Sequence, residues 1–215
     1  MKIRNVMGAK LTLDSGETVL LEKLGKGMFH TCYLDPKTQQ VYSITIERDM
    51  ASDYSKEILS NCDANPHIPP VEALGYLDNS DRRVYCMPHY QPIRAAHKTA
   101  WNLLKSLEQA RADAWNAIYS REVATHKMRG TDIGYLVNQL TCGVMDRPGV
   151  PQSLKDALDI LRGESANYGS SYIFEFSRRN VMVDSTGNLI LLDVLFDMEA
   201  LEAIRSKRRQ LIIAG

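Results

Sequence analysis

The chain has 215 residues, 44% of them hydrophobic and 24% charged, which is enough to bury a core in one domain or in two small lobes. Its 26 basic and 26 acidic residues cancel, and this neutral balance argues against a dedicated nucleic-acid binder or membrane-surface protein. The four cysteines form no CxxC pair, so we expect reduced thiols rather than a zinc site or a disulfide framework. With no secretory-type start and no apolar run of about 18 residues, the sequence predicts a cytoplasmic protein.

The first half of the sequence consists of short strand-like segments separated by turns. Alternating and β-branched residues predict strands at residues 11–13, 18–24, 30–34, 41–46, 71–77 and 83–87. The polar turn at residues 14–16 favours a hairpin between the first two. One helix is predicted at residues 52–61, capped by Ser52 or Asp53 and ended by the proline-rich segment 65–70. Together these elements predict an antiparallel sheet with one helix.

The second half of the sequence is mainly helical. Apolar residues recur at close to helical spacing and predict helices at residues 99–124, 133–142 and 153–162. Two short strands follow around Asn180 and Leu191, and a last helix is predicted at residues 198–210. The basic run 205–209 is either a solvated helix end or a contact for an acidic partner. We therefore expect an α+β fold with an N-terminal part at residues 1–91 and a C-terminal part at residues 92–215. The boundary between the two parts falls in the Gln-Pro-Ile segment 91–93.

The segment 174–194 carries the most informative motif. Glu175 precedes Asn180 by five residues, and a short strand, a polar turn and a second strand then lead to Asp193. A carboxylate and an amide carbonyl that a hairpin brings together can bind Mg²⁺, which prefers hard oxygen ligands. An isolated acid at a strand end can equally cap a turn. The interpretation of Asp193 as a metal ligand therefore depends on its pairing with Asn180.

A second motif lies between the strands predicted at 18–24 and 30–34. Gly25, Lys26 and Gly27 form a G-x-G sequence whose backbone could approach a polyphosphate, with Phe29 covering the loop tip. Two glycines that flank a lysine also occur in an ordinary hairpin, and His30 stands where the usual third glycine would be. The loop alone leaves both interpretations open.

The order of these motifs resembles the protein-kinase-like superfamily over residues 18–200. The G-x-G-x-F loop, the Pro-Ile-Pro-like segment 67–69 and the Asn-Val-Met segment 180–182 are similar to those of the small early Ser/Thr protein kinases of lytic podoviruses. Bacterial kinases that modify antibiotics share the N-V-x-V-D-x-x-G element. The resemblance implies a small antiparallel β-sheet N-lobe with one helix and a compact helical C-lobe, in a protein that, if phage-encoded, works in the host cytoplasm.

The resemblance also implies ATP and Mg²⁺ as cofactors and assigns roles to individual residues. Gly25 and Gly27 would cover the phosphates, and Asn180 and Asp193 would bind the magnesium ions. Glu175 would stand at the position of the catalytic acid, which orients the attacking hydroxyl group and accepts its proton.

The hinge between the two lobes falls at residues 85–90. The resemblance implies that backbone groups near Met87 and His89 bind adenine and that Met87 lies at the back of the pocket. A strand that ends at a proline, Pro88, explains the same residues without a ligand.

The family lysine that holds the phosphates is missing from its strand. Thr45 occupies that position and cannot provide a cation, so Arg48, Lys26 or Lys56 would have to reach in from elsewhere. Arg48 would point to the other face of a regular strand. Glu57, the expected partner of the lysine, would pair with Arg48 or face water.

The catalytic loop also departs from the family pattern. Glu175 replaces the family aspartate and moves the carboxylate by about 1.5 Å, a displacement that can cost on the order of 100-fold in rate. Arg178 or Arg179 could supply a compensating positive charge near the γ-phosphate. No Ala-Pro-Glu sequence follows Asp193, which implies a shortened platform for peptide substrates.

These retained and lost positions leave two main hypotheses about function. The first is a divergent Mg-ATP-dependent kinase that phosphorylates serine or threonine of a host protein with weak or specialised activity. The alternative is a pseudokinase that binds and regulates a host protein. A small-molecule kinase of the antibiotic-modifying type is a third interpretation, which the short helical part disfavours. None of the three requires membrane or direct nucleic-acid binding.

Overall fold

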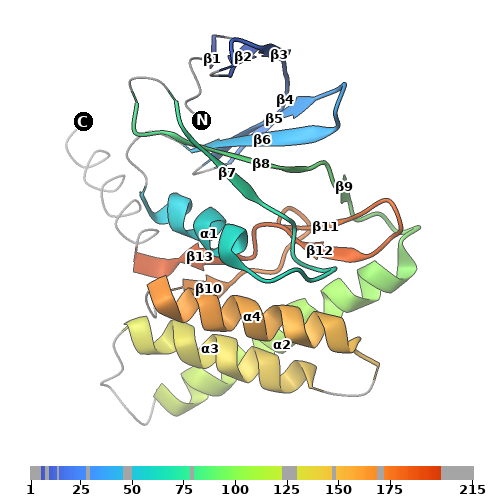
Figure 1. Cartoon of the computed structure of the whole chain (residues 1–215). Helices are drawn as coiled ribbons and strands as arrows, with labels where there is room; N and C mark the ends of the chain where they lie inside the picture. Colours follow the sequence, from blue (N-terminus) through green and yellow to red (C-terminus); the bar gives the residue numbers. More distant parts are fainter. Residues whose placement is uncertain are drawn as a thin grey trace, which may run out of the picture.

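The computed structural model describes residues 6–7, 10–13, 15–27, 30–45, 50–77, 80–122, 130–146, 149–168 and 172–199. Antiparallel sheets make up most of the N-terminal half, and three of the four described helices follow in the C-terminal half (Figure 1). The predicted α+β class is therefore confirmed. Among the described residues, no helix is long and apolar enough to cross a membrane.

A five-stranded antiparallel sheet, in the order β4-β5-β6-β8-β7, forms the centre of the N-terminal half. Its strands are β4 (Glu22–Lys26), β5 (His30–Asp35), β6 (Gln40–Thr45), β7 (Glu72–Tyr76) and β8 (Arg83–Pro88). A smaller sheet joins β1 (Val6–Met7), β2 (Lys10–Thr12) and β3 (Thr18–Leu20). Two strands in different sheets, β3 and β4, therefore stand where the sequence predicted a single strand at 18–24. The buried Leu21 lies between them.

The two faces of the five-stranded sheet bury different neighbours. Tyr42 and Ile44 on β6 pack with Leu11 and Leu21 in an outer cluster. Val41, one residue away, belongs instead to the main core that includes the helices. Since successive side chains of a strand point to opposite faces, β6 is buried on both sides. The face that carries Val41 and Thr45 is the one turned towards the C-terminal half.

The helices are α1 (Met50–Asn61), α2 (Lys98–Glu122), α3 (Gly130–Met145) and α4 (Gln152–Tyr168). Their existence was predicted, but α3 and α4 extend beyond the predicted 133–142 and 153–162. In α4 the buried face continues through the small residue Ser165, which carries no apolar signal. The helix predicted at 198–210 lies almost entirely outside the described residues.

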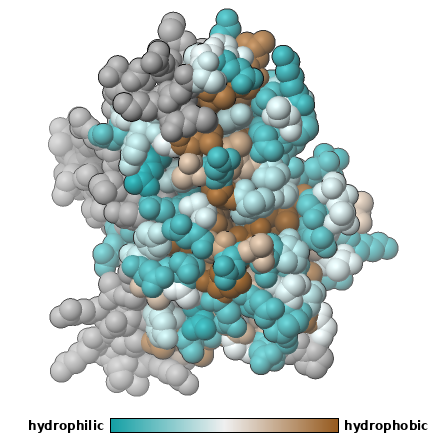
Figure 2. Space-filling model, in the orientation of Figure 1, coloured by the Kyte–Doolittle hydropathy of each residue, from teal (hydrophilic) through white to brown (hydrophobic). Residues whose placement is uncertain are grey.

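Two small sheets complete the fold, and one of them connects the halves. β11 (Val181–Val183) pairs with both β12 (Leu189–Leu191) and β9 (Gln91–Pro92), so the segment predicted as a boundary is hydrogen-bonded to the second half. β10 (Tyr172–Phe174) pairs with β13 (Leu195–Asp197). One continuous core cluster contains residues of the five-stranded sheet together with residues of α2, α4, β11 and β12. Figure 2 shows several hydrophobic residues in the middle of this face of the molecule.

The four cysteines are free thiols at partly exposed positions. Burial raises the pKa of Cys62 and of Cys142 to about 11, so both thiols are protonated at neutral pH and are poor nucleophiles.

Candidate functional site

The hairpin of β11 and β12 brings Asn180 and Asp193 together. Val181 pairs with Leu191, so the residues just outside the two strands meet at one end of the hairpin. There the backbone carbonyl of Asn180 accepts hydrogen bonds from the N–H groups of Leu192 and Asp193, both at 3.0 Å. The Asp193 side chain remains 41% exposed. A carboxylate and an amide thus lie next to each other at an accessible end of the hairpin.

The opposite end of this hairpin is closed by a different acid. Asp184 accepts hydrogen bonds from Thr186 and Asn188, and Gly187 adopts a φ of +88°, which glycine tolerates best. Partial burial disfavours the charged carboxylate, but these hydrogen bonds outweigh it and lower the pKa of Asp184. Asp184 is therefore a turn-forming residue, and Asp193 is the acid available for other contacts.

Glu175 follows β10 and is held beside the same junction. Its N–H donates to the carbonyl of Val194 at 2.7 Å, and its own carbonyl accepts from Nδ2 of Asn180 at 3.4 Å. The residue is exposed. The three residues of the sequence motif are therefore linked: the Asn180 side chain bonds the carbonyl of Glu175, and the Asn180 carbonyl accepts the N–H of Asp193.

Two polar residues on the helices fix the strand that leads to Glu175. Asn138 of α3 bonds the carbonyl of Tyr172 and the N–H of Phe174, both at 2.9 Å. Arg111 of α2 donates from Nε to the carbonyl of Phe174 at 2.6 Å. Burial lowers the pKa of Arg111, and the negative charge of Glu175 partly offsets this effect. Sequence reasoning missed both residues, because each looks like an ordinary polar residue of a helix.

Lys56 of α1 contacts the site from the N-terminal half. Its Nζ lies 3.3 Å from Oδ1 of Asp193 and 3.2 Å from the carbonyl oxygen of Leu192. Only 4% of the residue is exposed. Lys56 was one of three cations that the sequence left open as substitutes for the missing lysine.

Thr45 and Glu57 are engaged within the N-terminal half. The hydroxyl of Thr45, which is 1% exposed, accepts the N–H of Arg83 at 2.8 Å. Glu57 forms an ion pair with Arg83 of β8, with 2.6 Å between Oε2 and Nη1. Glu57 thus has a partner in Arg83 while its side chain stays 34% exposed, and a pairing with Arg48 stays a prediction. Arg48 itself lies outside the described residues.

The glycine motif forms a hairpin between β4 and β5. Gly25 pairs with Cys32, and the N–H of Gly27 donates to the carbonyl of His30 at 2.8 Å. A side-chain carbon placed on Gly25 would have no neighbour within 4 Å, so there is open space beside this backbone. Lys26 is exposed, and Phe29 at the tip lies outside the described residues.

At the predicted hinge, the two candidate residues differ in availability. Met87 is 3% exposed and belongs to the main core. The N–H of His89 donates to the carbonyl of Gln39 at 2.9 Å, so a ligand could use this donor only by breaking that bond. The buried position of Met87 fits both a strand that ends at Pro88 and the back of an adenine pocket.

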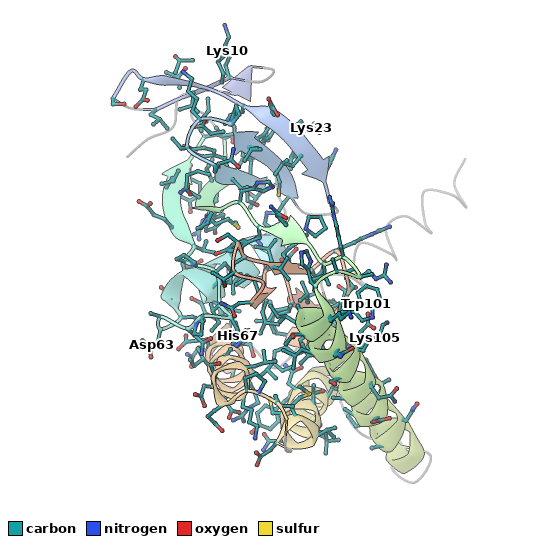
Figure 3. All side chains as sticks on the ribbon, turned by 90° about the vertical axis from the view of Figure 1, so that its right-hand side faces the viewer. Lys10, Lys23, Asp63, His67, Trp101 and Lys105 are labelled. Carbon is teal, nitrogen blue, oxygen red and sulfur yellow. The ribbon has the colours of Figure 1, made fainter. Side chains whose placement is uncertain are left out.

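The arginine that follows the catalytic-loop acid is stacked on a tryptophan. The guanidinium carbon of Arg178 lies 4.0 Å from the ring centroid of Trp101 on α2, and Nζ of Lys105 lies 5.7 Å from it. Figure 3 shows Trp101 and Lys105 near the upper end of this helix. Arg178 is thereby held against α2, and no contact ties Arg179 to a comparable position among the described residues.

His67 connects the loop between α1 and β7 to the hairpin and to α4. Its Nδ1 lies 2.7 Å from the carbonyl of Leu189, and its Nε2 lies 3.0 Å from the hydroxyl of Ser153. The carbonyl of His67 accepts the N–H of Leu191 at 2.8 Å. Since a carbonyl only accepts, Nδ1 carries a proton. Figure 3 shows His67 between the ribbons of these elements.

The donor set fits a magnesium ion held together with phosphate oxygens better than a metal held by protein alone. Within the described ranges, no three His, Cys, Asp or Glu side chains gather in a way that could hold a metal. Mg²⁺ commonly takes one or two carboxylates and completes its six ligands with water and phosphate. Asp193 supplies such a carboxylate, and Asn180, whose Nδ2 points to Glu175, can offer its Oδ1.

The site thus joins a partly exposed carboxylate, Asp193, to the buried ammonium group of Lys56. No protein-family model matches this chain, and none of the curated proteins compared with it is significantly similar in sequence.

Proposed function

We propose that the protein is a divergent, Mg-ATP-dependent phosphotransferase with a two-lobed kinase-like arrangement, acting on serine or threonine of a partner protein. The observation that carries this proposal is the junction of Asn180 and Asp193 with Lys56 in contact with Asp193. A buried cation, an exposed carboxylate and an amide at one place are the groups that bind a metal-bound polyphosphate.

The proposed roles follow from these contacts. Asp193 and Asn180 bind the magnesium ion, which when bound neutralises charge on the phosphates. Glu175 orients the attacking hydroxyl group and accepts its proton. Arg111 lies close enough to interact electrostatically with the Glu175 carboxylate. The N-terminal hairpin with Gly25 and Gly27 covers the phosphates.

The alternative is a pseudokinase that regulates a host protein without phosphate transfer. The buried hydroxyl of Thr45 favours it, since the family lysine is replaced by a residue that is committed to Arg83. The same experiment distinguishes the two functions.

The test is thermal melting with and without millimolar Mg-ATP, followed by transfer of labelled phosphate. At about 100 times the dissociation constant, a bound nucleotide stabilises by about 2.7 kcal/mol, which for a chain of this size raises Tm by roughly 5–10 °C. We expect this shift in the wild type and its loss in Asp193→Ala. The matched control is Asp146→Ala, which removes an exposed acid that pairs with Lys155 on α4.

Each outcome decides between the hypotheses. A shift together with labelling of a partner protein, abolished by Asp193→Ala, supports the enzyme. A shift without labelling of protein in a host lysate supports the pseudokinase. No shift at millimolar Mg-ATP contradicts nucleotide binding altogether.

A further inference from the structure

Lys56 is unusual for a lysine because its charged group is buried. Lysines on helices generally keep their ammonium groups in water, and burying an ammonium group is costly unless it is paired. Here 4% of the residue is exposed, and Nζ contacts Asp193 and the carbonyl of Leu192. An apolar residue of similar size would serve packing at least as well as a buried ion pair. A role in binding explains the lysine better than stability does.

The ion pair is open to solvent on one side only. Asp193 is 41% exposed, whereas the Lys56 side chain is 5% exposed. A ligand that approaches Asp193 would therefore meet the carboxylate first and the ammonium group behind it. This order suits a metal-bound anion, since the metal pairs with the carboxylate and the anion with the ammonium group.

The charges of Lys56 and Asp193 both act on Cys32, which pairs with Gly25 of the glycine hairpin. This residue of β5 pairs directly with Gly25, and its thiol lies 3.8 Å from the hydroxyl of Ser43. Burial raises the pKa of Cys32, while the charges of Lys56 and Asp193 act on it in opposite directions. Both charged groups thus lie within electrostatic range of the strand that follows the hairpin.

Two other described cations of the sheet and of α2 are committed to other contacts. Arg83 pairs with Glu57 and also bonds Tyr76, and Arg111 donates to a strand carbonyl. Lys26 is exposed on β4. Over the described ranges, Lys56 is the cation that forms an ion pair with Asp193.

We propose that Lys56 is the residue of this chain that binds the nucleotide phosphates, so that helix α1 supplies the cation that the family places on the strand occupied here by β6. This inference rests on the proposed nucleotide binding and adds the residue that holds the polyphosphate. Glu57, the next residue of α1, pairs with Arg83 of β8, so the helix that carries Lys56 is also linked to the sheet.

The test compares nucleotides with and without phosphates. Calorimetry gives the dissociation constants of Mg-ATP, Mg-ADP and adenosine for the wild type, Lys56→Met and the control Lys155→Met, which loses a remote ion pair between α4 and Asp146. We expect Lys56→Met to weaken both Mg-nucleotides at least tenfold and to leave adenosine unchanged. The control should bind all three like the wild type. Equal loss for adenosine, or unchanged Mg-ATP binding, would overturn the assignment.

A second measurement uses the unmodified protein and does not depend on a variant that folds. An acyl-phosphate derivative of ATP transfers its acyl group to a lysine amine beside the phosphates: the amine attacks the acyl carbon, the acyl–oxygen bond breaks, and ATP leaves. Mass spectrometry should find the acyl group on Lys56, and excess ATP should prevent it. Labelling of Lys26 instead would refute the role of Lys56 but keep the proposed nucleotide binding. A wild type that binds no Mg-nucleotide would refute both.

Discussion

At the scale of single residues, the proposed transfer depends on the length of the acid at position 175. Glu175 is fixed through its backbone to Val194 and Asn180, so a shorter side chain would withdraw the carboxylate without moving the loop. If the proposed transfer is weak because the carboxylate is misplaced, Glu175→Asp should raise the rate by about tenfold or more, within the roughly 100-fold that such a displacement can cost.

The measurement is labelled phosphate transfer at saturating Mg-ATP, with Glu175→Gln as the partner variant. Glu175→Gln keeps the length and removes the charge, so its rate should fall below that of the wild type while nucleotide affinity is retained. A Glu175→Asp variant slower than the wild type would mean that the site is built around the longer acid.

The residues of the site were partly predictable. The hairpin motif indicated that Asn180 and Asp193 meet, because that depends only on local pairing. The contact of Lys56 could not be derived. On a helical wheel it lies at the edge of the face formed by Ile58 and Leu59, where a lysine is usually solvated. Its burial depends on how α1 packs against the distant β12–β13 segment, which is tertiary information.

At the scale of elements, the ion pair between α1 and β8 should control orientation more than stability. Glu57 and Arg83 are each about one third exposed on their side chains, so the pair is worth no more than about 1 kcal/mol. Arg83→Met should therefore lower Tm by only a few degrees. Because the pair sets the rotation of α1, its loss should weaken Mg-ATP binding several-fold through Lys56.

Lys155→Met again serves as the matched control, since it breaks an ion pair of the same kind between α4 and Asp146. Its effect on Tm should be similar, with no change in Mg-ATP affinity. Equal affinities for Arg83→Met and Lys155→Met would show that the ion pair does not position Lys56.

Elements with long periodic patterns were predicted from the sequence, whereas among the three-residue strands β11 and β12 were predicted but β10 and β13 were not. α2 matches its predicted range to within two residues, because Leu104, Leu107 and Ala110 repeat a helical face. β10 and β13 have three residues each, too few to show alternation, and they form only by pairing with each other across about 25 positions of sequence. Such strands are defined by their partners rather than by their own residues.

At the scale of the whole molecule, the two halves should unfold together, because one core cluster contains residues from both and His67 ties the loop after α1 to β12 and α4. Far-UV circular dichroism reports on all elements, and fluorescence of Trp101 and Trp115 reports on α2, so the two signals should give one coincident transition.

His67→Leu leaves the buried carbonyl of Leu189 without its donor and should cost about 1–3 kcal/mol, or roughly 2–12 °C in Tm, in both signals alike. The control His97→Leu changes a more exposed ring and should stay within about 0.5 kcal/mol of the wild type. Two separate transitions, or a loss in one signal alone, would mean that the halves are independent, and a cation on α1 could then reach Asp193 only when the halves are docked.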